Sequence, residues 1–252
     1  MRNDARINWR PDRAHRVGPK LGRLLLALCL SLGTLFFATA VGGAHPGHYT
    51  CFGRVATHHG TPGNDTIIGT NGDDVLVGLG GSDTLKGWGG NDRICGNGND
   101  VITAEVLMGG RGRDRISGGE GADTINGEKG SDLIRGGRGA DEMRGAFDND
   151  SVWGGKGNDT LYGFEGHDTL RGGPGDDYVT GQSDGDKSYG NAGDDVIEDR
   201  FWGPDELYGG EGDDSLDAYD NQEGYDVLDG GPHFIADECN SDARDSQRNC
   251  EL

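Results

Sequence analysis

Apolar residues recur every nine positions along the central part of this chain, inside segments that are otherwise polar. Between residues 109 and 198 the sequence divides into ten consecutive units of nine residues, with no insertion or deletion. Each unit begins with glycine and has an apolar residue at its eighth place, except for Ser188. The apolar residues are Ile116, Ile125, Ile134, Met143, Val152, Leu161, Leu170, Val179 and Ile197. A short, fixed period predicts a stack of similar units rather than a globule.

The residues around each apolar position predict a minimal strand. Side chains alternate across a strand, so of the residues at places seven, eight and nine only the middle one can point inward. Glycines at places one and four suit tight turns, because glycine permits positive φ and close backbone approach. Two turns and two strands make one coil from two units. We therefore expect an all-β fold, a parallel β-roll, which is a right-handed β-helix of two short-stranded parallel sheets around a thin aliphatic core.

The register extends on both sides of the regular block. Four units in phase precede it from Gly60, and others follow as far as Asp229, which gives about eighteen units. Residues 96–103 form a unit that is one residue short, and residues 104–108 fit no unit. Residues 199–208 carry one extra residue, and residues 218–229 carry three. We expect an interruption near Ala104 and an irregular end after Asp199.

Aspartate at the sixth place is the candidate chemistry of the repeat. Stacking would place these carboxylates in rows at a spacing of about 4.8 Å, the distance between neighbouring strands. Such rows repel strongly unless cations lie between the charges. Calcium accepts six to eight oxygen ligands and tolerates mixtures of carboxylate and carbonyl, whereas magnesium requires a stricter octahedron. The alternative is that the aspartates only cap glycine-rich turns by hydrogen bonding to the backbone.

The units resemble the GGxGxDxUx repeat of the repeats-in-toxin (RTX) family of calcium-binding proteins, from about Gly60 to Asp229. The resemblance implies multiple calcium ions as cofactor, each held by aspartate carboxylates and backbone carbonyls of turns stacked in successive coils. Four aspartates match in turns that are shortened, altered or interrupted: Asp100, Asp186, Asp205 and Asp226. The metal ligands that the resemblance implies are Asp65, Asp74, Asp83, Asp92, Asp114, Asp123, Asp132, Asp141, Asp150, Asp159, Asp168, Asp177, Asp195 and Asp214.

Composition and charge narrow the class of partner. The chain of 252 residues has 50 glycines, 32% hydrophobic residues and a formal net charge of −21. Low apolar content with high charge is typical of disorder, and an acidic disordered calcium buffer is one alternative. The strict period disfavours it, because disorder requires no fixed spacing. Nucleic acid is excluded as an expected partner, since phosphate binding requires clustered Lys and Arg. Cations suit this charge.

The N-terminal segment has the layout of a secretory signal peptide. Basic residues extend to Arg23, an apolar run covers residues 24–38, and small residues follow. Cleavage after Ala40 or after Ala44 fits equally well. We therefore expect a secreted, extracellular protein with no membrane span once the signal is removed. A retained membrane anchor is the alternative, although the run is barely long enough to cross a bilayer.

Four cysteines remain after signal removal: Cys51, Cys95, Cys239 and Cys250. An even number in an exported protein favours disulfides over free thiols. Three pairings are possible. The pairs Cys51–Cys95 and Cys239–Cys250 are favoured, because the members of each pair lie near the same end of the repeat array. A zinc site is a weaker alternative, since the chain has no C-x-x-C spacing.

The sequence predicts four segments and a non-catalytic role. We expect a signal peptide at 1–44, an N-terminal cap segment at 45–59, calcium-binding repeats at 60–229 and a C-terminal disulfide-bearing tail at 230–252. Nucleophile elbows, H-E-x-x-H and Walker loops are absent from the sequence. We expect a monomeric structural or binding module, with calcium and cell-surface polysaccharide as candidate partners. The alternative is a calcium-dependent polysaccharide-active enzyme or accessory module, centred on the irregular stretch 199–229.

Overall fold

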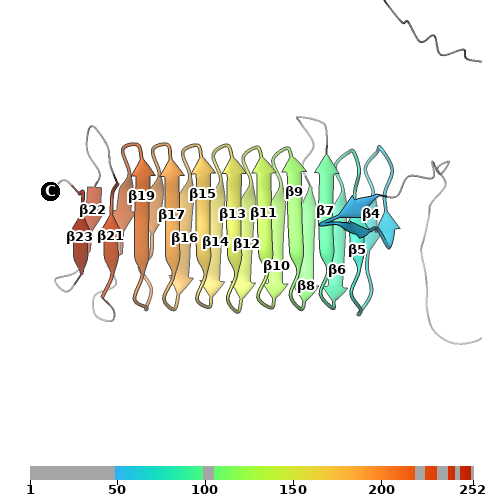
Figure 1. Cartoon of the computed structure of the whole chain (residues 1–252), viewed down its shortest axis with the longest axis horizontal. Coiled ribbons are helices and arrows are strands. Elements are labelled where there is room, and N and C mark those ends of the chain that lie inside the picture. Colours follow the sequence, from blue (N-terminus) through green and yellow to red (C-terminus); the bar gives the residue numbers. More distant parts are fainter. Residues whose placement is uncertain (1–48, 99–104, 219–224, 232–237, 242–244, 251–252) are drawn as a thin grey trace, which may run out of the picture. The chain divides into compact units, whose positions relative to one another are not determined.

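The chain forms stacked coils whose strands make two parallel sheets (Figure 1). The computed structural model describes residues 49–98, 105–218, 225–231, 238–241 and 245–250. The predicted signal peptide lies outside these residues. In the part of the chain that is described, no helix is long and apolar enough to cross a membrane. The all-β, parallel β-roll architecture expected from the nine-residue period is confirmed.

The first sheet contains the even-numbered strands from β4 onward, and each pairs in parallel with the strand one coil away. Its strands, in chain order, are β4 (Thr66–Ile68), β6 (Thr84–Gly89), β8 (Val106–Arg111), β10 (Thr124–Lys129), β12 (Glu142–Phe147), β14 (Thr160–Glu165), β16 (Tyr178–Ser183), β18 (Val196–Glu198), β20 (Ser215–Asp217) and β22 (Glu238–Asn240).

The second sheet contains the odd-numbered strands from β3 onward, again all parallel. A separate antiparallel hairpin, β1 (Thr50–Cys51) and β2 (Arg54–Val55), precedes it. The strands of the second sheet are β3 (His58–His59), β5 (Val75–Val77), β7 (Arg93–Gly98), β9 (Arg115–Glu120), β11 (Leu133–Arg138), β13 (Ser151–Lys156), β15 (Thr169–Pro174), β17 (Lys187–Ala192), β19 (Glu206–Glu211), β21 (Val227–Asp229) and β23 (Ser246–Arg248).

The strand register repeats every two units. Ile125 in β10 lies opposite Met143 in β12, and Ile134 in β11 lies opposite Val152 in β13. Figure 1 shows the strands of the two sheets pointing in opposite directions. Equivalent side chains therefore stack directly above one another on each sheet, which is the arrangement that turns a sequence repeat into rows of identical groups.

The strands are longer than the three residues expected. Pairing in β10 and β12 continues past places seven to nine into the next turn, where Glu128 lies opposite Ala146. Place two of the turn adopts positive φ even where it is not glycine, as at Glu128 (φ 74°) and Phe164 (φ 80°). The close stacking of the coils therefore imposes this backbone conformation on whichever residue stands at place two. Glycine at this place lowers the strain but is not needed for the conformation to form.

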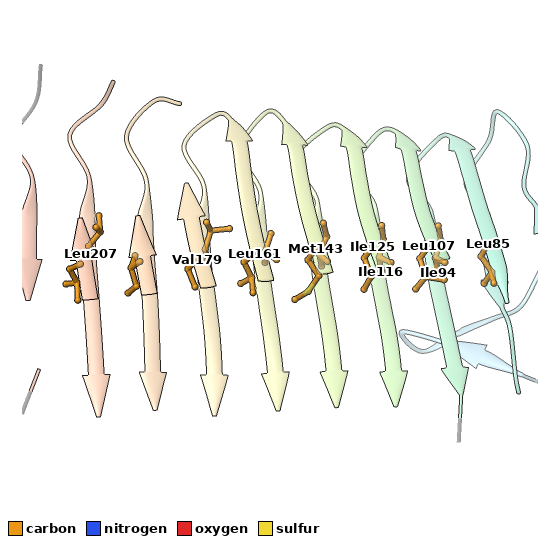
Figure 2. Close-up of a cluster of buried hydrophobic side chains, with 14 of the residues drawn as sticks. Leu85, Ile94, Leu107, Ile116, Ile125, Met143, Leu161, Val179 and Leu207 are labelled. Carbon is orange, nitrogen blue, oxygen red and sulfur yellow. The ribbon is translucent and has the colours of Figure 1, made fainter. Parts of the chain in front are cut away.

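The eighth-place side chains form one continuous core between the sheets (Figure 2). From Leu76 to Leu228 they are at most 1% exposed, and at the first coil Ile67 is 8% exposed. Ser188 occupies the same buried position, between Leu170 and Leu207 in register. Each strand contributes one such side chain, so the core between the two sheets is thin.

The irregular units keep this register. Leu107 lies opposite Leu85 in the neighbouring coil, and Val106–Met108 form the strand core of β8. The expectation that residues 104–108 fit no unit is therefore wrong for residues 105–108, while Ala104 lies outside the described residues. Glu105 directly precedes β8 and Leu107 reaches the core, so β8 keeps the register of the stack in spite of the irregular spacing in the sequence. The stack likewise continues to the C-terminal end, where β22 pairs with β20 and β23 pairs with β21.

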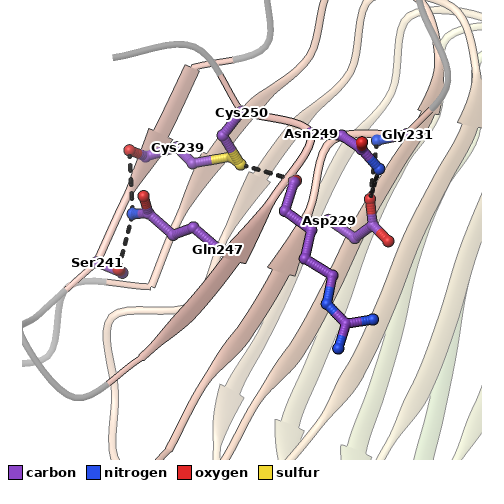
Figure 3. The surroundings of a disulfide bond; sticks show 8 residues. Asp229, Gly231, Cys239, Ser241, Gln247, Asn249 and Cys250 are labelled. Carbon is purple, nitrogen blue, oxygen red and sulfur yellow. Dashed lines mark hydrogen bonds between the residues drawn. A yellow bond between two sulfur atoms is a disulfide. The ribbon is translucent and has the colours of Figure 1, made fainter.

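The two disulfides lie at the two ends of the stack, in the favoured pairing. Cys51 of the β1–β2 hairpin is bonded to Cys95 on β7, and both pack with Val75 and Val77 of β5. Cys239 is bonded to Cys250 at the other end, where both contact the main core (Figure 3). Cys239 takes an eighth-place position opposite Leu216. The first bond therefore ties the hairpin to the coils, and the second joins β22 to the segment that follows β23.

Candidate metal centre

The sixth-place carboxylates form two ladders, one directly before the strands of each sheet. Because the two sets of strands point in opposite directions (Figure 1), the ladders lie along opposite edges of the stack. The first ladder is Asp65, Asp83, Glu105, Asp123, Asp141, Asp159, Asp177, Asp195 and Asp214; the second ladder is Asp74, Asp92, Asp114, Asp132, Asp150, Asp168, Asp186, Asp205, Asp226 and Asp245.

All fourteen predicted ligands lie in these ladders, together with residues that the sequence did not single out. Asp100 falls outside the described residues. Its expected place is taken by Glu105, whose Oε2 accepts a hydrogen bond from the Asp83 N–H at 3.1 Å. Asp245 ends the second ladder, accepting from the Asp226 N–H at 3.1 Å. The spacing of the strands around them, rather than the motif, identifies these two residues.

From the second residue of each ladder onward, each carboxylate uses its two oxygens differently. Its Oδ1 accepts a hydrogen bond from the backbone N–H of the ladder residue one coil earlier, as from Asp132 to Asp150 (2.7 Å) and from Asp141 to Asp159 (2.9 Å). The other oxygen is buried and has no hydrogen-bond partner in Asp83, Asp92, Glu105, Asp114, Asp123, Asp132, Asp141, Asp150, Asp159, Asp168, Asp177, Asp186 and Asp195. A buried carboxylate oxygen without a donor is costly unless a cation compensates it.

The first residue of each ladder differs from the rest. Oδ2 of Asp65 accepts hydrogen bonds from the backbone N–H (2.6 Å) and the hydroxyl (2.9 Å) of Thr61. Oδ2 of Asp74 is satisfied in the same way by Thr70, at 2.6 and 2.8 Å. Local capping of the turn, the alternative considered for the whole array, therefore describes the second oxygen in these two units, but not in the carboxylates named above whose second oxygen has no partner.

Burial raises the pKa of the carboxylates named above as having an unpartnered oxygen, which makes them hard to ionise in the absence of a cation. It raises the pKa of Asp132 to about 9 and those of Asp150 and Asp195 to about 8. The backbone hydrogen bond to each carboxylate opposes this shift, and the neighbouring carboxylates add to it. Desolvation is the largest cause in each case, so a buried positive ion is the natural means of keeping these groups charged.

Glycine at place one leaves room beside each carboxylate. A Cβ added to Gly154 would meet Oδ2 of Asp159 and would lie 2.5 Å from the carbonyl oxygen of Gly172 in the next coil. The equivalent oxygens one coil earlier lie beside Gly136; they are Oδ2 of Asp141 and the carbonyl oxygen of Gly154. Carboxylate and carbonyl oxygens thus converge at these turns. This oxygen-only donor set fits calcium.

The fold and the ladders together define a β-roll protein whose turns hold metal ions. The sequence model of the RTX calcium-binding nonapeptide repeat (4 copies) matches residues 59–94, 103–134, 127–161, 162–197 and 201–221, which is more than half of the chain. The chain therefore belongs to this family, and Ca²⁺ is its cofactor. No toxin domain is evident in the described residues. No curated protein matches the sequence significantly.

Proposed function

We propose that this protein is a secreted, monomeric calcium-binding module whose β-roll orders when calcium fills the two ladders. The observation that carries the proposal is the row of buried carboxylate oxygens that lack a hydrogen-bond donor. Calcium bound between successive coils replaces the missing donors and neutralises the stacked charges. The residues that we assign as ligands are the fourteen aspartates named above, with Glu105, Asp186, Asp205, Asp226 and Asp245 extending the ladders.

Isothermal titration of the calcium-free protein tests this proposal. We expect several calcium ions to bind per chain, because each ladder repeats the same donor set along its length. Magnesium should bind more weakly at the same concentration, since it gives up its hydration water reluctantly. Failure to bind calcium at millimolar concentration would refute the proposal.

We propose secretion and a division into four segments on separate grounds. Two disulfides suit an oxidising compartment, and residues 1–44 have the composition of a cleaved signal. Residues 45–59, 60–229 and 230–252 then form the N-terminal cap, the repeats and the disulfide-bearing end. N-terminal sequencing of the protein from the culture medium should begin at Val41 or His45. A cell-bound product that retains residues 1–40 would support the membrane-anchor alternative.

A pocket on the outer face of the first sheet favours a second candidate function, binding of polysaccharide. It has a volume of about 280 Å³ and is lined by Tyr162, Tyr178, Glu198, Arg200 and Phe201, among others. The rings of Tyr162 and Tyr178 lie 6.1 Å apart, and the Tyr178 hydroxyl donates to Glu198 at 3.1 Å. Aromatic faces beside a few fixed polar groups suit a sugar ring.

We propose binding rather than catalysis at this pocket. Glu198 is the single carboxylate among the lining residues, whereas glycoside hydrolysis normally requires two. A glycan-array screen in calcium tests the idea, with Tyr178→Ala expected to abolish any signal. Tyr208→Ala is the matched control, because Tyr208 stacks on Tyr189 on the second sheet. Equal binding by both variants, or none by the unaltered protein, would rule out this pocket.

A further inference from the structure

Asp199 takes the first place of its unit, which glycine occupies in the regular repeats. Its backbone N–H donates to the carbonyl oxygen of Asp217 in the next coil at 2.7 Å. Gly78 makes the equivalent bond to Cys95, at 2.9 Å. The backbone at Asp199 therefore follows the repeat, although the unit carries an extra residue and the motif does not predict a carboxylate there.

The Asp199 side chain turns into the second ladder rather than toward solvent. The residue is fully buried, at 0% exposure. Its Oδ2 accepts a hydrogen bond from the Gln182 N–H at 3.2 Å, and its Oδ1 has no hydrogen-bond partner in the protein. One oxygen from each of Asp186, Asp199 and Asp205 lies within 4.8 Å of the others. Oδ2 of Asp186 is likewise buried without a partner. Two unsatisfied, fully buried oxygens thus belong to this three-carboxylate cluster.

Comparison of two successive coils shows what the Asp199 carboxylate replaces. A Cβ on Gly163 would meet Oδ2 of Asp168 and, at 2.6 Å, the carbonyl oxygen of Gly181. A Cβ on Gly181, one coil later, would meet Oδ2 of Asp186 and Oδ2 of Asp199. A carboxylate oxygen of Asp199 therefore stands where the preceding coil presents the carbonyl oxygen of Gly181.

We propose that Asp186, Asp199 and Asp205 form a distinct cation site that binds calcium more tightly than the repeat sites and fills first. This proposal rests on the proposed calcium-binding function. The affinity of an oxygen site for calcium rises with the number of charged ligands, and here Asp199 adds a third carboxylate to the neighbouring ladder residues Asp186 and Asp205. The third negative charge also favours a trivalent ion of similar size, such as Tb³⁺, over calcium.

Titrations of the full chain with Ca²⁺ and with Tb³⁺ test the site. In the unaltered protein we expect one equivalent to bind at least tenfold more tightly than the rest. Asp199→Asn should lose this tight class of binding sites, while the weaker binding sites remain. Asp199→Gly restores the residue that the repeat itself uses at place one, so it should fold in calcium and lose the same class. Glu211→Gln is the control, because it removes one exposed charge from a neighbouring strand.

The outcomes separate this proposal from the one on which it rests. If the unaltered protein binds no calcium, the proposed function fails. If it binds several ions and both Asp199 variants retain a single tight class equal to that of Glu211→Gln, only the three-carboxylate site fails. Loss of the tight class in both Asp199 variants, with calcium-induced β structure preserved, supports the site.

Discussion

The backbone N–H of Asp150 donates a hydrogen bond to Oδ1 of Asp168, one coil further along, at 2.7 Å. Oδ2 of the same Asp168 carboxylate is buried and has no hydrogen-bond partner. One oxygen therefore holds two coils in register, and the other is left for a cation. The same division runs along both ladders beyond their first residues, so one oxygen of the sixth-place carboxylate is a backbone acceptor and the other is available to a cation.

Substitutions of Asp168 should separate these two roles. Asp168→Asn keeps an oxygen that can accept the Asp150 N–H but removes the negative charge. We therefore expect a higher calcium midpoint, the calcium concentration at which half of the protein has folded. Stability should fall little once calcium saturates. Asp168→Ala also leaves that N–H without an acceptor, which should cost about 1–3 kcal/mol more. Calcium titration and urea unfolding measure the two effects.

Asp213→Asn is the matched control, since Asp213 is exposed and lies one place before a ladder residue. It should leave the calcium midpoint nearly unchanged. A calcium midpoint for Asp168→Asn equal to that of Asp213→Asn would argue against a ligand role for Asp168.

Low pH should partly substitute for calcium. Burial raises the pKa of Asp132 to about 9 and those of Asp150 and Asp195 to about 8, whereas the ordinary value is 3.8. The folded, calcium-free roll therefore binds more protons than the unfolded chain between these values, and its stability falls as pH rises through that window. We expect more β structure at pH 5 than at pH 8 in calcium-depleted protein.

Calcium should reverse this pH dependence, because the ligands must lose their protons to bind the ion. Calcium affinity should rise from pH 5 to pH 8, and binding should release protons that a pH-stat can measure at pH 6–7. Calcium binding without proton release, together with a pH-independent calcium-free spectrum, would contradict the burial of these carboxylates.

Ser188 is the weak point of the aliphatic core. It is fully buried between Leu170 and Leu207, and its hydroxyl has no hydrogen-bond partner in the protein. Ser188→Val removes an unsatisfied polar group and adds apolar contact, which should stabilise the calcium-bound protein by about 1–2 kcal/mol. Urea denaturation in calcium measures this change. Ser215→Val, on the solvent-facing side of β20, should have a much smaller effect; equal effects would show that burial is not the cause.

The regular part of the fold follows from the sequence because one physical unit repeats. Glycine, aspartate and an aliphatic residue at fixed places predict the coil, the core and the ladders, and all three are present from Ile116 to Ile197. Glu105 and Asp199 could not be predicted in the same way. Inserted residues change the spacing there, and only the path of the backbone shows that each side chain still reaches a ladder.

The positive φ at place two is also invisible in the sequence. Large side chains such as Trp88 (φ 83°) and Phe164 (φ 80°) ordinarily avoid this conformation. Contacts between neighbouring coils impose it, so it depends on the complete stack rather than on local preference. The hairpin over β5 was likewise not predicted, because its contacts with Val75 and Val77 cover an outward face that the repeat leaves to solvent.

The most direct test of the account is a far-ultraviolet circular dichroism titration of the full chain with calcium. At pH 8 a thin aliphatic core does not offset two rows of buried carboxylates that lack a cation, so we predict a largely disordered spectrum in EGTA at this pH. At millimolar calcium the spectrum should become rich in β structure, and EGTA should reverse the change. The same spectrum in EGTA as in calcium would contradict the account.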